Sequence, residues 1–263
     1  MDLWQRREAQ IPILIDVPHA GTYVPPELLE RFTPEAQPLP DTDWHVDKLV
    51  AFSQKLGTGL LAATHSRYVV DLNRDPFGAL LYPGIDNTEL VPLSRFDNGP
   101  IYQPGQTPES AEIAQRIDIY WRPYHDRLKA DIEDILERFG QCLLLDCHSI
   151  PASVPRFFEG RLPDLNLGTA DGKSASRSLI ETAWNALDSQ ARYTRVQDGR
   201  FKGGYITRHY GQPEKRVHAL QIEIVQDCYM DEATPRNFDA LSAASLIEVL
   251  ENLVGALSKR LHF

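Results

Sequence analysis

Cysteine is scarce in this chain of 263 residues. The three cysteines, Cys142, Cys147 and Cys228, are an odd number and form no Cys-x-x-Cys pair. The count disfavours a disulfide framework, and the spacing disfavours a zinc site built from cysteines. We therefore expect all three to be buried thiols that pack within strands.

Positive charge is also scarce. The chain has 27 Lys and Arg against 37 Asp and Glu, which gives a formal net charge of -10. Proteins that bind nucleic acid or acidic membranes need clustered basic residues to replace counterions, so both are poor candidates as partners. A small anionic substrate remains compatible with the sequence, because a few arginines can dominate the charge of one pocket.

Long apolar runs are missing as well. The opening MDLWQRREAQ lacks the apolar core of a signal peptide, and no later stretch approaches the roughly 18 apolar residues of a membrane span. These features predict a cytoplasmic protein with no membrane partner. No internal repeat and no linker composition divides the chain, so we expect a single domain over residues 1–263, with its oligomeric state left open.

Short apolar runs bounded by turn residues predict strands. They span Ile11–Val17, Leu60–Thr64, Tyr68–Leu72, Cys142–Cys147 and Val217–Val225. The first and fourth runs are almost uninterruptedly apolar, which is typical of strands covered on both faces. The last run alternates in part, which predicts a strand nearer an edge or a cleft.

Helical spacing of apolar residues appears between and after these runs. The predicted helices span Asp43–Leu56, Thr107–Phe139, Ser174–Leu187 and Pro235–Leu261. Pro123 should kink or split the second helix. Strands that alternate with helices predict an α/β sandwich around a central mixed sheet. Two long segments rich in Pro, Gly, Asn and Asp, Phe77–Gln106 and Pro151–Gly172, are expected to form lids or pocket walls.

Two histidines stand at the ends of predicted strands. His19 lies in VPHAG after the first strand, and His148 lies in DCHS after the fourth. Ligands bind at the carboxyl ends of strands in α/β proteins, and neutral imidazole is the commonest zinc ligand. Each histidine alone is more often structural or solvated, but the pair indicates a metal site. Asp146 is a candidate to orient His148 or to anchor the following loop.

An oxygen donor should complete the site, because a catalytic zinc ion usually has three protein ligands and one open position. Asp43 and Asp47 lie four residues apart in LPDTDWHVDKL, on one face of the predicted helix. Asp43 is nearer to the helix start and is the preferred ligand, with Asp47 as the alternative. An acidic first turn that only caps the helix also fits this pattern.

Glu223 is a carboxylate inside the apolar strand pattern LQIEIV. A buried charge is costly unless it is paired, bound to a metal or catalytic. Glu223 is therefore a candidate general base that activates a metal-bound water, and a salt bridge to a neighbouring arginine is the alternative.

Arginines are the natural receptors of substrate carboxylates, because the guanidinium fork binds them with two hydrogen bonds. Arg67 and Arg74 flank the third predicted strand, and Asn73 lies beside Arg74. A Gly-bounded loop, GGYITRHYG, adds Tyr205 and Arg208. These five residues are the candidates for substrate binding, although loop arginines are commonly only solvated and Tyr205 is equally compatible with ordinary packing.

Between Ile11 and Met230 the chain carries IDVPHAGTYVP, LPDTDWHVDKL, SRYVVDLNRDP, LLDCHS, and GGYITRHYG followed by VHALQIEIVQDCYM. These blocks resemble, in order, the N-formylglutamate amidohydrolases, also called N-formylglutamate deformylases. Five blocks in order are far more specific than any one of them. The resemblance implies a fold similar to that of the zinc carboxypeptidases and aminoacylase-like deacylases, an α/β/α sandwich around a mixed sheet.

In those relatives an early His and a nearby Glu bind zinc, a later His completes the set, and a Glu in a late strand is the general base. The resemblance implies these roles for His19, His148 and Glu223. Where the relatives carry the nearby Glu, this chain has Thr22. The third ligand is therefore sought at Asp43.

The resemblance further implies hydrolysis of N-formyl-L-glutamate to formate and L-glutamate in histidine degradation, with one divalent metal ion, expected to be zinc. Glu223 would take a proton from the attacking water and deliver it to the leaving amine, and Arg74 would help to stabilise the oxyanion. The alternatives are a deacylase or carboxypeptidase-like hydrolase for another N-acyl amino acid, and a metal-free protein of the same fold that binds an acyl amino acid.

Overall fold

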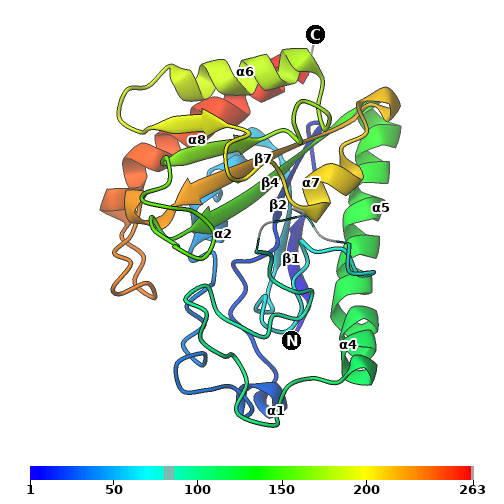
Figure 1. The fold of residues 1–263 in the computed structure, drawn as a ribbon. Helices are drawn as coiled ribbons and strands as arrows, with labels where there is room; N and C mark the ends of the chain where they lie inside the picture. The colour runs from blue at the N-terminus through cyan, green and yellow to red at the C-terminus, as the bar shows by residue number, and fades with distance from the viewer. Residues whose placement is uncertain (80, 82–83, 85, 262–263) are drawn as a thin grey trace.

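The computed structural model describes residues 1–79, 81, 84 and 86–261 (Figure 1). The strands are β1 (Trp4–Arg7), β2 (Ile13–Val17), β3 (Gly59–Ala63), β4 (Cys142–Ile150), β5 (Leu165–Gly168), β6 (Arg195–Gln197) and β7 (Val217–Val225). The α-helices are α1 (Pro26–Leu29), α2 (Val46–Leu49), α3 (Ser53–Leu56), α4 (Ser110–Arg116), α5 (Arg122–Phe139), α6 (Arg177–Asp188), α7 (Tyr205–Tyr210) and α8 (Ala240–Leu261). A π-helical turn is η1 (Ile117–Trp121), and 3₁₀ turns are η2 (Pro213–Lys215) and η3 (Gln226–Cys228).

The strands form one mixed sheet in the order β1-β3-β2-β4-β7-β5-β6. The central pairs β3–β2, β2–β4 and β4–β7 are parallel, whereas β1 and β5 pair antiparallel to their inner neighbours. Parallel pairing brings the carboxyl ends of β2, β4 and β7 to the same edge of the sheet, where open α/β sheets bind ligands.

Helices cover both faces of this sheet (Figure 1). Apolar side chains from β2, β4 and β7 pack against α6 and α8 on one face. On the other face, the amino-terminal halves of the same strands pack against α5, and Ile206 of α7 joins them. The predicted α/β fold with a central mixed sheet is therefore confirmed, and its layers are helix, sheet and helix.

One strand prediction is wrong. Tyr68–Leu72 is an irregular, buried segment, which begins with a turn closed by a hydrogen bond from Val69 N to Ser66 O. Its apolar residues divide between two core clusters, so burial alone explains the run. β7 lies inside the sheet rather than at its edge, and Gln221 and Glu223 near its carboxyl end line a cavity, so the expected position beside a cleft is confirmed. The short strands β5 and β6, hidden in turn-rich sequence, cover its outer side.

Two helix predictions and one loop prediction also change. Asp43–Leu56 forms only the short helices α2 and α3, and α2 begins after His45, which adopts a left-handed conformation with φ of 63°. The long helix is interrupted by η1, before Pro123 rather than at it. The Gly-bounded segment GGYITRHYG contains helix α7 instead of being a loop throughout.

Helix α8 corrects the expectation that no stretch approaches a membrane span. It is long and apolar enough by length and composition alone, and 33% of its most apolar window is buried. Leu246, Leu250 and Leu253 of this helix belong to the core that α6 also covers. The apolar stripe of α8 therefore packs against the sheet layer of the protein.

The cysteine prediction holds for two of the three thiols. Cys142 and Cys147 are buried in β4, whereas Cys228 lies in η3 and is partly exposed. The thiol of Cys228 is therefore an exception to the expected packing within strands.

Candidate active site

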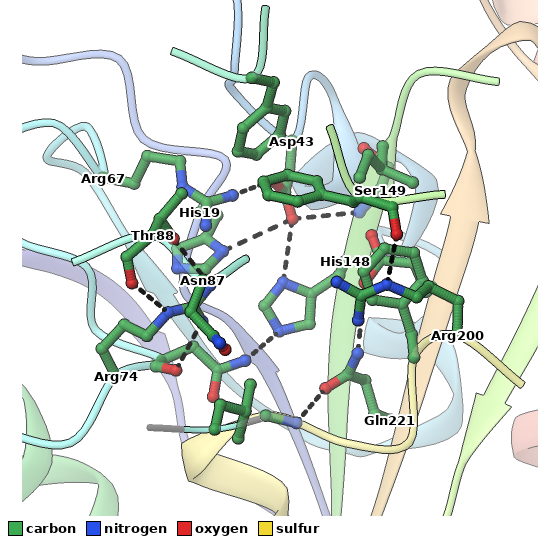
Figure 2. Close-up of a pocket in the computed structure, with 18 of the residues that line it drawn as sticks. His19, Asp43, Arg67, Arg74, Asn87, Thr88, His148, Ser149, Arg200 and Gln221 are labelled. Carbon is green, nitrogen blue, oxygen red and sulfur yellow. Dashed lines mark hydrogen bonds and ion pairs between the residues drawn. The ribbon is translucent and has the colours of Figure 1, made fainter. Parts of the chain in front are cut away.

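A cavity of about 70 Å³ opens at the carboxyl ends of β2, β4 and β7 (Figure 2). Both long Pro- and Gly-rich segments contribute to it, as predicted, with Asn87, Thr88 and Phe96 from the first and Phe157 from the second. Several predicted site residues line the same cavity: His19, Asp43, Arg67, Asn73, Arg74, His148 and Glu223. The structure therefore gathers candidates that are separated by up to two hundred residues along the chain.

The sheet register brings the histidines and the glutamate together. His148 lies inside β4, rather than after it, and pairs in register with Glu223 of β7. His19 follows β2 by two residues, and its ring centroid lies 4.8 Å from that of His148. Because paired residues on neighbouring strands point to the same face, His148 and Glu223 enter the cavity side by side.

Asp43 reaches this point from the segment before α2. Its backbone N–H donates to the carbonyl of His19 at 3.1 Å, which holds the segment against the end of β2. Its carboxylate Oδ2 lies 2.9 Å from His148 Nδ1 and accepts a hydrogen bond from Ser149 N at 3.1 Å. Asp47, the alternative ligand, lies on α2 and lines a different groove near Met1.

The far nitrogen of each histidine faces a carboxylate. His19 Nε2 lies 2.7 Å from Asp71 Oδ1, and His148 Nε2 lies 2.7 Å from Asp146 Oδ1. Such a carboxylate favours a proton on Nε2 and leaves the Nδ1 lone pair available to a cation. Asp146 therefore lies where it can orient His148, which is the first of the two roles expected for it. Asp71 was not a candidate, because it stands in a run that was interpreted as a strand.

The near atoms form a donor set that fits a divalent metal ion. His19 Nδ1, His148 Nδ1 and an Asp43 oxygen belong to buried side chains, and one donor atom from each lies within 4.8 Å of the others. Within the described part of the chain, no hydrogen-bond partner reaches the buried His19 Nδ1. Two imidazoles and one carboxylate are a typical set for a catalytic zinc ion with an open position.

The charges of this group are strongly coupled. Burial alone would raise the pKa of Asp43, but the hydrogen bond with His148 and the charge interactions with His19 and His148 lower it below its usual range. Burial likewise opposes ionisation of His148, yet Asp146 and Asp43 raise its pKa well above the ordinary value. The pKa of Asp71 is held well below its usual range, against burial, chiefly by His19 and Arg67. These interactions therefore keep Asp43 and Asp71 ionised.

Glu223 has the opposite electrostatic setting. Burial raises its pKa to about 8; His148 opposes this shift and Asp43 adds to it. Gln221, two residues earlier on the same face of β7, donates from Nε2 to Glu223 Oε2 at 3.2 Å. A carboxyl group with a pKa near neutrality can both accept and return a proton, which is what a general acid and base must do.

The three candidate arginines differ in their partners and in the cavity that they line. Arg67 is buried and bound to acids, with Nη2 2.7 Å from Asp71 Oδ2 and Nη1 3.4 Å from Asp43 Oδ1. Arg74 lines the cavity and donates to the carbonyl and hydroxyl oxygens of Thr88. Arg208, together with Tyr205, lines an adjoining cavity instead, which shares Asn73 and Arg74 as a wall.

Arg200 is a cavity residue that sequence analysis missed. Its Nε donates to the carbonyl of Phe157 at 2.7 Å, and its guanidinium lies over the ring of Phe201. Figure 2 places Arg200 and Arg74 on different sides of His148. Arg200 lies in an ordinary polar turn with no motif around it, so no local signal distinguishes it from a solvated arginine.

Comparison with known proteins agrees with this arrangement. A family model described as N-formylglutamate amidohydrolase matches residues 11–230. The N-formylglutamate deformylases of Pseudomonas putida and Pseudomonas aeruginosa are 40% and 41% identical, over 95% of this chain and 93% and 94% of their own lengths.

Solved structures agree in fold. The N-formylglutamate amidohydrolase of Ralstonia eutropha JMP134 superposes with a TM-score of 0.84 at 29% identity, covering 100% of this chain and 99% of that one. A gene product of Agrobacterium tumefaciens, with a TM-score of 0.70 at 19% identity over 98% and 96% of the two chains, shares the fold. The resemblance seen in the sequence blocks is confirmed, and the chain belongs to the N-formylglutamate amidohydrolase family.

Proposed function

We propose that the protein hydrolyses N-formyl-L-glutamate to formate and L-glutamate with one divalent cation, zinc, held by His19, Asp43 and His148. The observation that carries the proposal is the convergence of these three ligands within 4.8 Å of one another in a cavity that also contains Glu223. The names of the relatives that match nearly the whole chain support the substrate. With it we propose a role in histidine degradation in the cytoplasm.

The bound cation would act as a Lewis acid that polarises the formyl group and lowers the pKa of water. Asp71 and Asp146 hold the two imidazole rings so that their Nδ1 atoms face Asp43. Partners of this kind commonly change metal affinity or activity by about 10- to 100-fold when they are removed.

Glu223 carries the proton transfers. It takes a proton from the water that adds to the formyl carbon, and it returns that proton to the nitrogen as the carbon–nitrogen bond breaks. Formate and the free amino group of glutamate are then the products. The buried setting of Glu223 suits both steps, because its pKa of about 8 lies near neutral pH.

The substrate's two carboxylates require two cationic contacts, and we propose Arg74 and Arg200 for them. Both line the cavity, and both also donate to neutral oxygens, of Thr88 and Phe157 respectively. Arg67 mainly orients Asp43 and Asp71, because its guanidinium lies against these two acids. Arg74 is also the candidate to stabilise the oxyanion.

Metal reconstitution with a substrate panel tests this proposal. The chain, stripped by a chelator, is supplied with zinc and assayed for release of the free amino acid from N-formyl-L-glutamate, N-formyl-L-aspartate, N-acetyl-L-glutamate and a formylated dipeptide. We expect zinc to restore activity and N-formyl-L-glutamate to have the highest kcat/KM.

Faster cleavage of N-acetyl-L-glutamate or of the dipeptide would favour a different deacylase or a carboxypeptidase-like enzyme. No turnover of any compound after metal is restored would contradict the enzymatic proposal and favour a binding protein of the same fold.

A further inference from the structure

Two aromatic side chains at the start of α5 contact the backbone carbonyls on either side of Asn73. Trp121 Nε1 donates to the carbonyl of Arg74 at 3.1 Å, and His125 Nε2 lies 2.8 Å from the carbonyl of Leu72. The two contacts therefore hold the chain on both sides of Asn73. Neither Trp121 nor His125 was among the site residues predicted from the sequence.

Both residues owe their positions to the π-helical turn. η1 ends at Trp121, and α5 begins at the next residue. A π turn adds one residue to a helix, so the side chains after it are rotated by about 100° relative to a continuous α-helix. Trp121, the last residue of η1, stacks on His125 of α5, with ring centroids 3.8 Å apart and planes inclined by 24°.

The hydrogen-bond partners of His125 define its tautomer. A carbonyl only accepts hydrogen bonds, so the contact with Leu72 O requires the proton on Nε2. Nδ1 then accepts from the hydroxyl of Tyr210 at 2.9 Å. Burial lowers the pKa of His125 to about 3, so the ring is neutral near pH 7 and keeps this single arrangement.

The residues held by this contact face the cavity. Asn73 accepts a hydrogen bond from Ile206 N at Oδ1, and its Nδ2 lies 2.9 Å from His148 Nε2. Arg74 lines the cavity beside Thr88. The two held carbonyls belong to the peptides Leu72–Asn73 and Arg74–Asp75, so a rotation of either peptide would displace the guanidinium that is proposed to meet a substrate carboxylate.

From this geometry we infer that Trp121 and His125 are positioning residues for substrate binding, which act by fixing the carbonyls of Arg74 and Leu72. The π turn is the feature of the fold that presents them. The inference rests on the proposed function, since it assigns to this pair control over the affinity for an anionic substrate through Arg74.

Trp121→Phe tests the inference, because it removes the indole N–H and keeps an aromatic ring against His125. We expect about a fivefold rise in KM for N-formyl-L-glutamate and in the Kd of L-glutamate measured by calorimetry, which corresponds to one neutral hydrogen bond of about 1 kcal/mol. The zinc content should be unchanged, and kcat should change less than KM.

Further variants separate positioning from general packing. Trp184→Phe, on α6 at the opposite face of the sheet, makes the same chemical change and should leave KM and Kd unaltered. In an Arg74→Lys background, Trp121→Phe should cause little additional rise, because both changes act on the same contact with substrate. His125→Gln, which keeps a donor near Leu72, should raise KM less than His125→Ala.

Unchanged KM and Kd in a folded Trp121→Phe protein would overturn the inference, and so would effects that simply add to those of Arg74→Lys. Failure of the proposed function is a different result, because the wild-type protein supplied with zinc would then neither release formate nor bind L-glutamate. That result would remove both the function and the positioning role that depends on it.

Discussion

The two faces of the central sheet differ toward the carboxyl edge of the strands. Toward α6 and α8, most side chains of β2, β4 and β7 are apolar: Ile13, Ile15, Val17, Leu143, Leu145, Cys147, Leu220, Ile222 and Ile224. Toward α5 they begin apolar, with Leu14, Leu144 and Ala219 in register, and become polar toward the carboxyl edge.

The polar half of this face consists of two rows. Asp16, Asp146 and Gln221 lie in register in the first row, and His148 and Glu223 pair in the second. Each row is buried, so its polar groups need partners. The hydroxyl of Tyr124, for example, donates to Asp16 at 2.6 Å. The face toward α6 and α8 therefore mainly stabilises the fold, whereas the carboxyl half of the face toward α5 carries the residues of the candidate active site.

Removal of His148 should have the largest effect. In His148→Ala we expect loss of the bound cation and of turnover, because a ligand is missing. The metal-free variant should also be less stable by about 3–5 kcal/mol, since Asp43 and Asp146 lose a buried ionic partner. Metal analysis and denaturant unfolding measure the two losses; a variant that retains metal and activity would contradict the proposed ligand set.

A truncation on the apolar face provides the contrast. Leu145→Ala should lower the free energy of unfolding by about 2–5 kcal/mol, because Leu145 is buried in the core beneath α6 and α8. Metal content and kcat/KM per folded molecule should stay close to those of the wild type. A large fall in kcat/KM at temperatures where this variant is fully folded would show that the two faces are not functionally separate.

The contribution of Arg200 should be smaller and confined to binding. Arg200→Gln is expected to raise KM by about tenfold or more, because charge-assisted hydrogen bonds are worth about 1.5–3 kcal/mol. The matched control is Arg208→Gln, since Arg208 lines the adjoining cavity and should affect KM less. Equal effects of the two substitutions on KM would remove the specific role of Arg200.

The titration of His125 should leave stability unchanged near neutral pH and lower it gradually as the pH falls. Its pKa falls from 6.5 to about 3 on folding, so between these values the unfolded chain binds a proton that the folded protein does not. The stabilisation is complete above pH 6.5 and declines by about 1.4 kcal/mol for each pH unit below it. The difference in slope between wild type and His125→Gln, from unfolding curves at pH 4–7, measures it; equal slopes would contradict the assignment.

Much of this arrangement could be predicted from sequence. Apolar strands that end in His19 and His148 indicate a shared edge, and Glu223 is conspicuous as a carboxylate within an apolar run. These signals are local, because hydrophobic periodicity and the residue at a strand end are visible in a few consecutive positions.

The rest depends on contacts between distant parts of the chain. Asp71 meets His19 across 52 residues of sequence, and its apolar neighbours made it resemble part of a strand. β5 and β6 have only four and three residues, too few for a periodic signal. The π turn lies within an ordinary helical pattern, so neither it nor the role inferred for Trp121 could be recognised before the fold was known.

The most direct test of the chemical role of the polar face is the metal content and turnover of Glu223→Gln. The substitution keeps the shape of the side chain and removes its ability to accept the proton of water. We predict a zinc content equal to that of the wild type and a fall in kcat of about 10³-fold. Full activity with zinc bound would contradict the assignment of Glu223 as the general base and, with it, the proposed mechanism.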